Sequence, residues 1–258
     1  DIVAFFFSLE ENKHIKDQQI PISFHNLLKE DEDFKIVFVV FYAAIIFHLA
    51  KLMQVKGLEM PRHILFSGRG SKVVNIVDPS PKLSSLSSLT RSIFKHVYQA
   101  EADTIELEQY PEPKEITCKG GLLSDVDIDI DRIKTVLLGT GDGTLVPEKS
   151  IKYPEVTEEV LQRVLGEVDE FMQVLFTIHQ DFNFAHNFGV NPSYLSSYQA
   201  MLQEDLMEYL KSGQQLKLKE LAGNQDVNVE ESLFFYPLTG ALNRLAFKIA
   251  TELTEEYN

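Results

Sequence analysis

Apolar residues recur with helical spacing in two segments of the first half of the chain. The first covers residues 34–56, and Gly57 followed by Pro61 ends it. It contains an uninterrupted apolar run of 12 residues, IVFVVFYAAIIF, from Ile36 to Phe47. A membrane span needs about 20 such residues, so we expect a helix buried in a protein core rather than a span. The second segment, Ser84–Tyr98, predicts an amphipathic helix.

Three short segments predict strands. His63 to Phe66 is apolar and ends at a glycine-bearing turn, and Thr104 to Leu107 alternates weakly between polar and apolar residues. Ile133 to Leu138 reads as a strand that leads into GTGDGT, Gly139 to Thr144. Because Asp-Gly is a common hairpin pair, we expect this glycine-rich sequence to be a hairpin turn rather than a phosphate-binding loop.

Helical spacing dominates after Pro147. Thr157 is expected to cap a helix with an acidic first turn, and Asn191-Pro192 is expected to start another. That second helix has an apolar stripe that continues to Leu210, and a last helix is expected from Leu238 onward. The chain is therefore predicted to have an α/β part, residues 1–150, and a mostly helical region, residues 151–258, packed on it.

The charge and the cysteine content narrow the class of protein. The formal net charge is −15, which excludes a binder of nucleic-acid backbones, because few basic groups are available to displace counterions. The single cysteine, Cys118, excludes an internal disulfide and a multi-cysteine metal cluster. The N-terminus lacks the features of a signal peptide. We expect a cytoplasmic protein with small-molecule or protein partners and no membrane association.

The sequence RHILFSGRGSKVV supplies the candidate binding site. It places Gly68, Arg69, Gly70, Ser71 and Lys72 where a predicted strand gives way to a helix, with Ser71 as the helix N-cap. Glycines let a flat ligand or a phosphate approach backbone N–H groups without a Cβ in the way. The same residues could equally form a tight connection with no ligand. The turn lacks the third glycine of the dinucleotide fingerprint and the Gly-Lys-Ser/Thr of a P-loop.

Other chemistry-bearing patterns are weaker. The acidic segment DVDIDID, Asp125–Asp131, lacks the glycine and the final glutamate of a calcium-binding EF-hand loop, so a solvated strand face is expected. The seven histidines show no ligand pairing on a helix, and Cys118 has no visible base partner. We therefore predict no catalytic residue and no metal ligand in this chain.

The order of these elements resembles the C-terminal half of the actin-like ATPases, the superfamily of actin, heat-shock chaperones, and acetate and sugar kinases. In that family a strand followed by Gly-Gly-x-Ser/Thr forms part of the adenosine pocket, and a later Gly-Gly opens a helix beside it. Here Gly68, Gly70 and Ser71 match the first motif, and Gly120-Gly121 matches the second. The resemblance covers residues 34–124. It implies a ribonuclease H-like fold, with ATP or ADP contacted around Gly68–Ser71 and with Lys72 near the base.

The chain also departs from that family. Its two Asp-x-Gly phosphate loops, which hold the phosphates and Mg²⁺, lie upstream of the adenosine turn, and residues 1–62 contain no such motif. The chain starts with aspartate, which favours a fragment of a longer ATPase that would supply those loops. We expect nucleotide binding without catalysis by this chain alone, and the helical region is the expected place for a protein partner. The alternative is a non-enzymatic protein-interaction module in which the glycine turn is purely structural.

Overall fold

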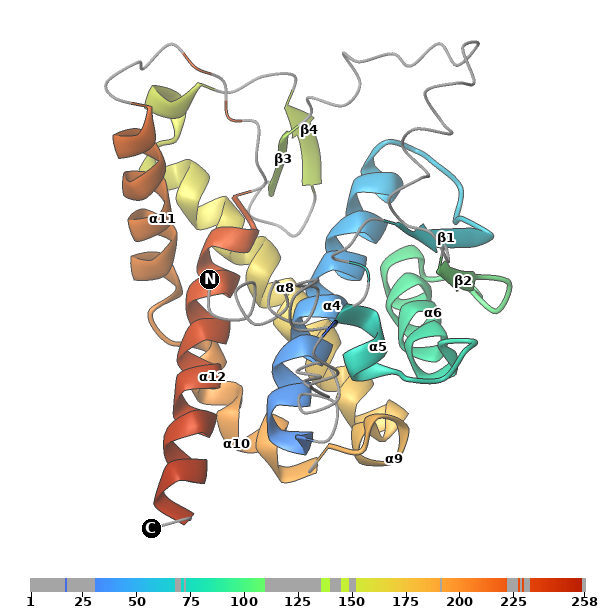
Figure 1. Cartoon of the computed structure of the whole chain (residues 1–258). Coiled ribbons are helices and arrows are strands. Elements are labelled where there is room, and N and C mark those ends of the chain that lie inside the picture. The colour runs from blue at the N-terminus through green and yellow to red at the C-terminus, as the bar shows by residue number, and fades with distance from the viewer. Residues whose placement is uncertain are drawn as a thin grey trace.

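The computed structural model describes residues 17, 31–67, 71, 73–109, 136–139, 145–148, 152–190, 192–221, 227, 229 and 233–256. Within these ranges the chain is mainly helical (Figure 1). The helices are α4 (Glu32–Val55), α5 (Val74–Val77), α6 (Ser84–Tyr98), α8 (Glu158–Phe182), α9 (Phe184–Phe188), α10 (Pro192–Gln203), α11 (Leu206–Glu220), α12 (Phe235–Glu256) and the 3-10 helix η3 (Tyr153–Glu155). The strands are β1 (His63–Phe66), β2 (Glu106–Gln109), β3 (Val136–Gly139) and β4 (Leu145–Glu148).

The strands pair two by two. β1 runs parallel to β2, and β3 runs antiparallel to β4. The predicted α/β class therefore holds only coarsely, because helices dominate and β1–β2 is the only parallel pair in the ranges given above. The antiparallel pairing joins Gly139 to Leu145 across the GTGDGT sequence, so the prediction of a hairpin there is confirmed.

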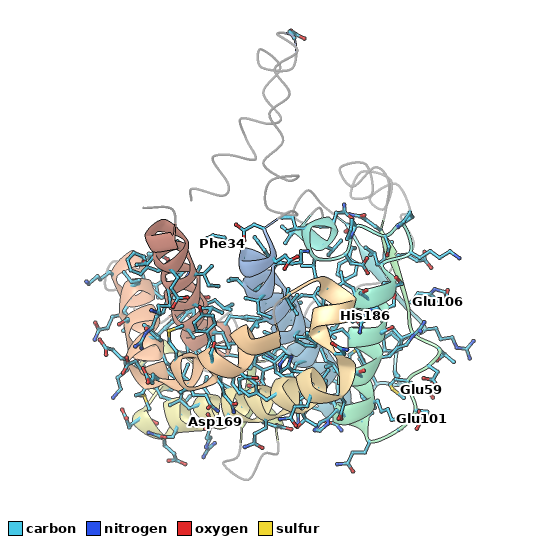
Figure 2. The ribbon with its side chains drawn as sticks, turned by 90° about the horizontal axis from the view of Figure 1, so that it is seen from below. Phe34, Glu59, Glu101, Glu106, Asp169 and His186 are labelled. Atoms are coloured by element: carbon cyan, nitrogen blue, oxygen red, sulfur yellow. The ribbon has the colours of Figure 1, made fainter. Side chains whose placement is uncertain are left out.

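Helix α4 forms the centre of the fold, as its apolar sequence predicted. The Asp31 carboxylate caps it by accepting a hydrogen bond from the backbone N–H of Phe34 at 3.0 Å. Gly57, with φ +66°, takes up the left-handed conformation that ends the helix. Figures 1 and 2 show α4 between α6 on one side and α12 on the other, with α8 crossing both. By length and composition alone, Phe34–Val55 is apolar enough to cross a membrane, and 56% of that apolar window is buried here.

One large core joins both halves of the chain. It combines side chains of α4 and α6 with side chains of α8, α10 and α12, so the helical region packs directly on the first part. Phe47 of α4 is fully buried against Phe171 of α8 and Phe234, which precedes α12, with ring centroids 5.5 and 6.1 Å away. Between α4 and α6 the hydroxyl groups of Tyr42 and Thr90 share a buried hydrogen bond of 2.7 Å.

A smaller second core lies at the N-terminal end of α8. Its buried members are Tyr153, Val156, Leu161, Val164, Leu210, Val229 and Leu233. Thr157 occupies the predicted N-cap position of α8, although its side chain makes no cap hydrogen bond. The acidic first turn, Glu158 and Glu159, complements the positive end of the helix dipole as expected.

The predicted helix from Pro192 to Leu210 is in fact two helices. α10 does start at Pro192, but it ends at Gln203, and α11 starts at Leu206. Asp205 between them has φ +57°, a left-handed conformation that breaks the helical hydrogen bonding. The break lets both helices pack on α12, with α10 also reaching α4 and α8 and α11 running along α12. The continuous apolar stripe concealed this change of direction.

Candidate functional site

The carboxyl ends of β1 and β2 lie side by side at the same end of the parallel pair. His63 lies opposite Glu106, and Phe66 lies opposite Gln109. Ile64 and Leu107, one residue on in each strand, turn toward the large core, whereas His63 and Glu106 are exposed. The segment after β1 leads into the helical turn that precedes α5. In open parallel sheets such an edge is where ligands bind.

Of the five predicted site residues, only Ser71 belongs to the described part of the chain. Gly68, Arg69, Gly70 and Lys72 lie outside it. The prediction that Gly120 and Gly121 approach this turn also falls on residues outside the described ranges.

Ser71 lies beside the end of β2. It is 8% exposed, and its carbonyl oxygen accepts a hydrogen bond from Nε2 of Gln109 at 3.3 Å. The expectation that Ser71 caps a helix is wrong: Ser71 lies within a 3-10 turn, and Val73 occupies the N-cap position of α5. The contact with Gln109 ties the segment that follows β1 to the last residue of β2.

A buried carboxylate holds together the connection from α5 to α6. Asp78 follows α5, is 4% exposed, and accepts hydrogen bonds from the backbone N–H groups of Ser80, Ser85 and Leu86 at 3.0, 2.8 and 3.1 Å. The Ser80 hydroxyl donates a further bond of 2.6 Å. Two of these amides belong to the first turn of α6, whose own N-cap residue makes no side-chain bond. Asp78 therefore caps α6 from outside the helix and fixes the crossover between β1 and β2.

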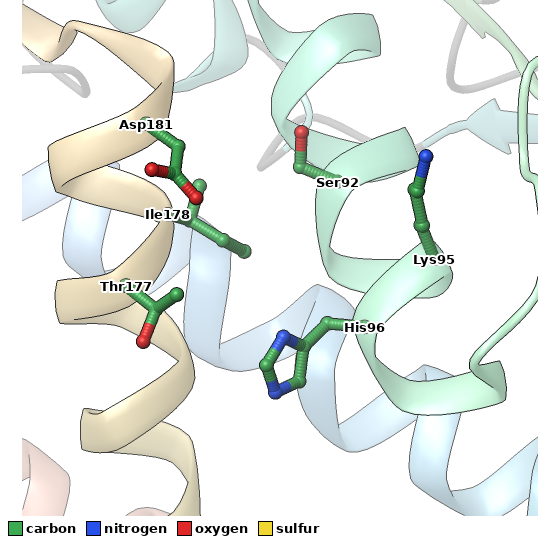
Figure 3. Close-up of a pocket in the computed structure, with 6 residues that line it drawn as sticks. All are labelled: Ser92, Lys95, His96, Thr177, Ile178 and Asp181. Atoms are coloured by element: carbon green, nitrogen blue, oxygen red, sulfur yellow. The ribbon is translucent and has the colours of Figure 1, made fainter.

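A cavity of about 260 Å³ lies between α6 and α8 (Figure 3). Ser92, Lys95 and His96 of α6 face Thr177, Ile178 and Asp181 of α8 across it. No sequence pattern indicated this cavity, because its two walls come from helices far apart in the chain.

The residue types in this cavity match a catalytic triad, but their arrangement does not. Figure 3 shows the Ser92 hydroxyl pointing away from the His96 ring. No hydrogen bond links Ser92, His96 and Asp181 in this part of the structure, and a triad requires a nucleophile bonded to its base. The Lys95 ammonium bonds both carboxylate oxygens of Glu101 at 2.8 and 2.9 Å, and this ion pair raises the Lys95 pKa. The cavity therefore contains no assembled nucleophile.

Comparisons with protein-family models, curated proteins and solved structures find no significant match to this chain.

Proposed function

We propose that this chain binds an adenine nucleotide, ATP or ADP, at the edge where β1 and β2 end. The observation that carries the proposal is the parallel pairing of β1 with β2, because the glycine-bearing segment follows the carboxyl end of β1 in the sequence and ligands bind at that end of a parallel sheet. The contact between Ser71 and Gln109 supports it further, since it holds Ser71, the last residue of the family motif, beside the end of the neighbouring strand.

Each residue of the turn has a role in the proposal. Gly68 and Gly70 leave room for the adenosine group against the backbone, and Ser71 ends the turn. Arg69 and Lys72 bring positive charge next to a polyphosphate in a chain whose net charge is −15. Mg²⁺ and the β- and γ-phosphates would need acidic and amide groups from a larger parent protein. The proposal therefore includes binding and no phosphoryl transfer by this chain.

The finer proposal is that this α/β part is the C-terminal half of an actin-like ATPase domain. The order of a buried helix, a strand, a glycine turn, helices and a parallel strand is consistent with it. The rival function, a protein-interaction module with a purely structural turn, makes the opposite prediction for nucleotide binding.

Isothermal titration calorimetry with ATP and ADP, each with and without Mg²⁺, tests this function. We expect saturable binding at submillimolar nucleotide. Gly70→Val, which fills the turn, and Arg69→Gln, which only removes a charge, should each weaken binding by about tenfold, or about 1.4 kcal/mol. Gly166→Ala is the matched control, because Gly166 lies in α8 and a Cβ added there would meet no atom within 4 Å. Circular dichroism of every variant separates loss of binding from loss of fold.

The result that overturns the proposal is an absence of saturable binding by the wild-type chain up to millimolar nucleotide. The interaction-module function would then be favoured. Binding that is equally strong in Gly70→Val, Arg69→Gln and the wild type would also overturn it, because the nucleotide would then occupy another part of the molecule.

A further inference from the structure

The outer face of the β1–β2 pair carries a compact set of metal-ligating side chains. Residues of a strand alternate between its two faces, so His63 on β1 and Glu106 and Glu108 on β2 share the face that points away from the core. The parallel register sets His63 directly opposite Glu106. Glu106 lies at the outer edge of the molecule in Figure 2.

The ligand atoms of the three residues are close enough to hold one ion. Nδ1 of His63 lies 2.8 Å from Oε1 of Glu108, and one donor atom from each residue lies within 4.8 Å of the other two. Zinc binds nitrogen and oxygen at about 2.1 Å, so its ligand atoms in a tetrahedral site lie about 3.4 Å apart. The His63–Glu108 separation is shorter than this value, and the 4.8 Å limit for the other pairs exceeds it by about 1.4 Å, so small side-chain rotations suffice to reach it. The side chains of His63 and Glu108 are 59% and 55% exposed, which leaves the ion free access.

A second observation favours a cation here. Glu106 and Glu108 lie on one face of one strand, and neither pairs with a lysine or arginine in the described part of the chain. Two carboxylates two positions apart on one strand face repel each other at the distances of this site, and glutamate is a poor strand former. A bound cation would remove the repulsion between the two carboxylates.

We propose that His63, Glu106 and Glu108 form a binding site for a divalent transition-metal ion, with zinc as the reference ion. One imidazole with two carboxylates suits ions of intermediate softness better than Mg²⁺ or Ca²⁺, which favour all-oxygen sites. The ion replaces the hydrogen bond between His63 and Glu108. Three protein ligands leave at least one position open to water, as in zinc sites that are not purely structural.

This site is independent of the proposed nucleotide function. It uses the outer face of the strands rather than their carboxyl edge, and it needs no phosphate. An ion bound there would also bridge β1 to β2 across 45 residues of chain. No pattern in the sequence indicated this site, because its ligands come from two strands and are brought together only by the parallel register.

Titration of the chain with Zn²⁺, and separately with Co²⁺, in a non-chelating buffer without nucleotide tests the proposal. A Cys118→Ser background removes the only thiol. We expect one ion to bind per chain at this site. Bound Co²⁺ should absorb visible light in the way that is typical of an ion with a low coordination number. His63→Ala should weaken binding by about 100-fold, and Glu106→Gln and Glu108→Gln by about tenfold each, the range found when metal-site groups are removed. His186→Ala, which removes another exposed histidine, is the matched control.

Two results overturn the proposal. One is the lack of saturable Zn²⁺ or Co²⁺ binding by the wild-type chain at submillimolar ion. The other is binding that survives all three substitutions unchanged or that is lost only in His186→Ala, because the ion would then bind elsewhere. The glutamine substitutions keep the shape of glutamate, so a loss of binding with unchanged circular dichroism supports ligation rather than misfolding.

Discussion

His48 on α4 lies against Glu167 on α8, with Nδ1 2.8 Å from Oε1. The Glu167 side chain is 1% exposed and that of His48 is 13% exposed. The His48 ring also stacks on Phe234, with centroids 5.0 Å apart. One turn further along the same two helices, the Lys51 ammonium bonds the Glu170 carboxylate. Two polar contacts therefore fix α4 and α8 in one register along the large core.

Removal of Glu167 is expected to destabilise the fold. Glu167→Ala leaves the largely buried imidazole of His48 without its carboxylate partner and opens space in the core, which should cost about 3 kcal/mol of unfolding free energy. Glu159→Ala is the matched control on α8, because Glu159 is exposed and makes a surface pair with Arg163; its cost should stay below about 0.5 kcal/mol. Urea unfolding measures both. Equal costs for the two variants would show that the buried pair contributes nothing specific.

The α11–α12 contact should be sensitive to glycine substitution. A Cβ at Gly240 of α12 would lie 2.2 Å from Cγ of Tyr209 on α11, and a Cβ at Gly213 of α11 would lie 2.8 Å from Cγ of Tyr236 on α12. Each helix therefore has a glycine at the point where a tyrosine of the other helix packs against it.

Gly240→Ala should therefore destabilise the protein by about 1–3 kcal/mol, despite the better helix propensity of alanine. Gly166→Ala, at an exposed and open helical position, should instead stabilise it by about 0.5–1 kcal/mol. Thermal or urea unfolding of the two variants gives the sign. A stabilising Gly240→Ala would contradict the packing seen here.

Tyr42 makes stability depend on pH in the alkaline range. Burial, the largest cause, raises the pKa of its hydroxyl well above the ordinary value of 10.0. Above about pH 10 the unfolded chain loses a proton that the folded chain keeps, so stability falls as pH rises. Below that pH the contribution is constant.

Tyr42→Phe removes this contribution. Between pH 10 and pH 12 the loss of stability per pH unit should be smaller in the variant, by up to about 1.4 kcal/mol. At pH 7 the variant should be about 1 kcal/mol less stable, because Thr90 loses its partner. Urea unfolding from pH 7 to pH 12 measures both effects. Parallel pH profiles for variant and wild type would be the contrary result.

Asp78 should be needed for the crossover between β1 and β2. Asp78→Ala leaves buried amides of α6 without an acceptor, and we expect a loss of about 3 kcal/mol. Asp78→Asn keeps an acceptor oxygen and should cost less. Asp103→Ala, an exposed loop carboxylate, is the control with an expected change within about 0.5 kcal/mol. Denaturant unfolding ranks the three, and an Asp78→Ala cost no larger than the control would show that this cap contributes nothing.

The elements with strong periodicity could be predicted from the sequence. β1 and α6 have the predicted bounds, and α4 ends where Gly57 indicated, because apolar spacing and stop residues act locally. The strand predicted at Thr104–Leu107 lies at Glu106–Gln109, since its position depends on pairing with β1. The break at Asp205 also depends on contacts with distant elements. The helices that pack against α10 and α11, and not the local helix propensity, determine where the helix ends.

The candidate sites could be predicted only in part. The glycine-bearing site could be proposed because one short segment carries its residues, and it stays a prediction, since only Ser71 of the five belongs to the described ranges. The set of His63 with Glu106 and Glu108, the pair His48–Glu167 and the cavity between α6 and α8 were not visible. Each of them joins residues of different elements, and no spacing in the sequence reports such a contact.

The most direct measurement of the central claim is photo-crosslinking with 8-azido-ATP, followed by mass-spectrometric mapping of the labelled peptide. We predict an adduct within residues 67–73 or beside Gln109 that unlabelled ATP competes away. An adduct confined to another part of the chain, or one that unlabelled ATP leaves unchanged, would contradict nucleotide binding at the end of β1.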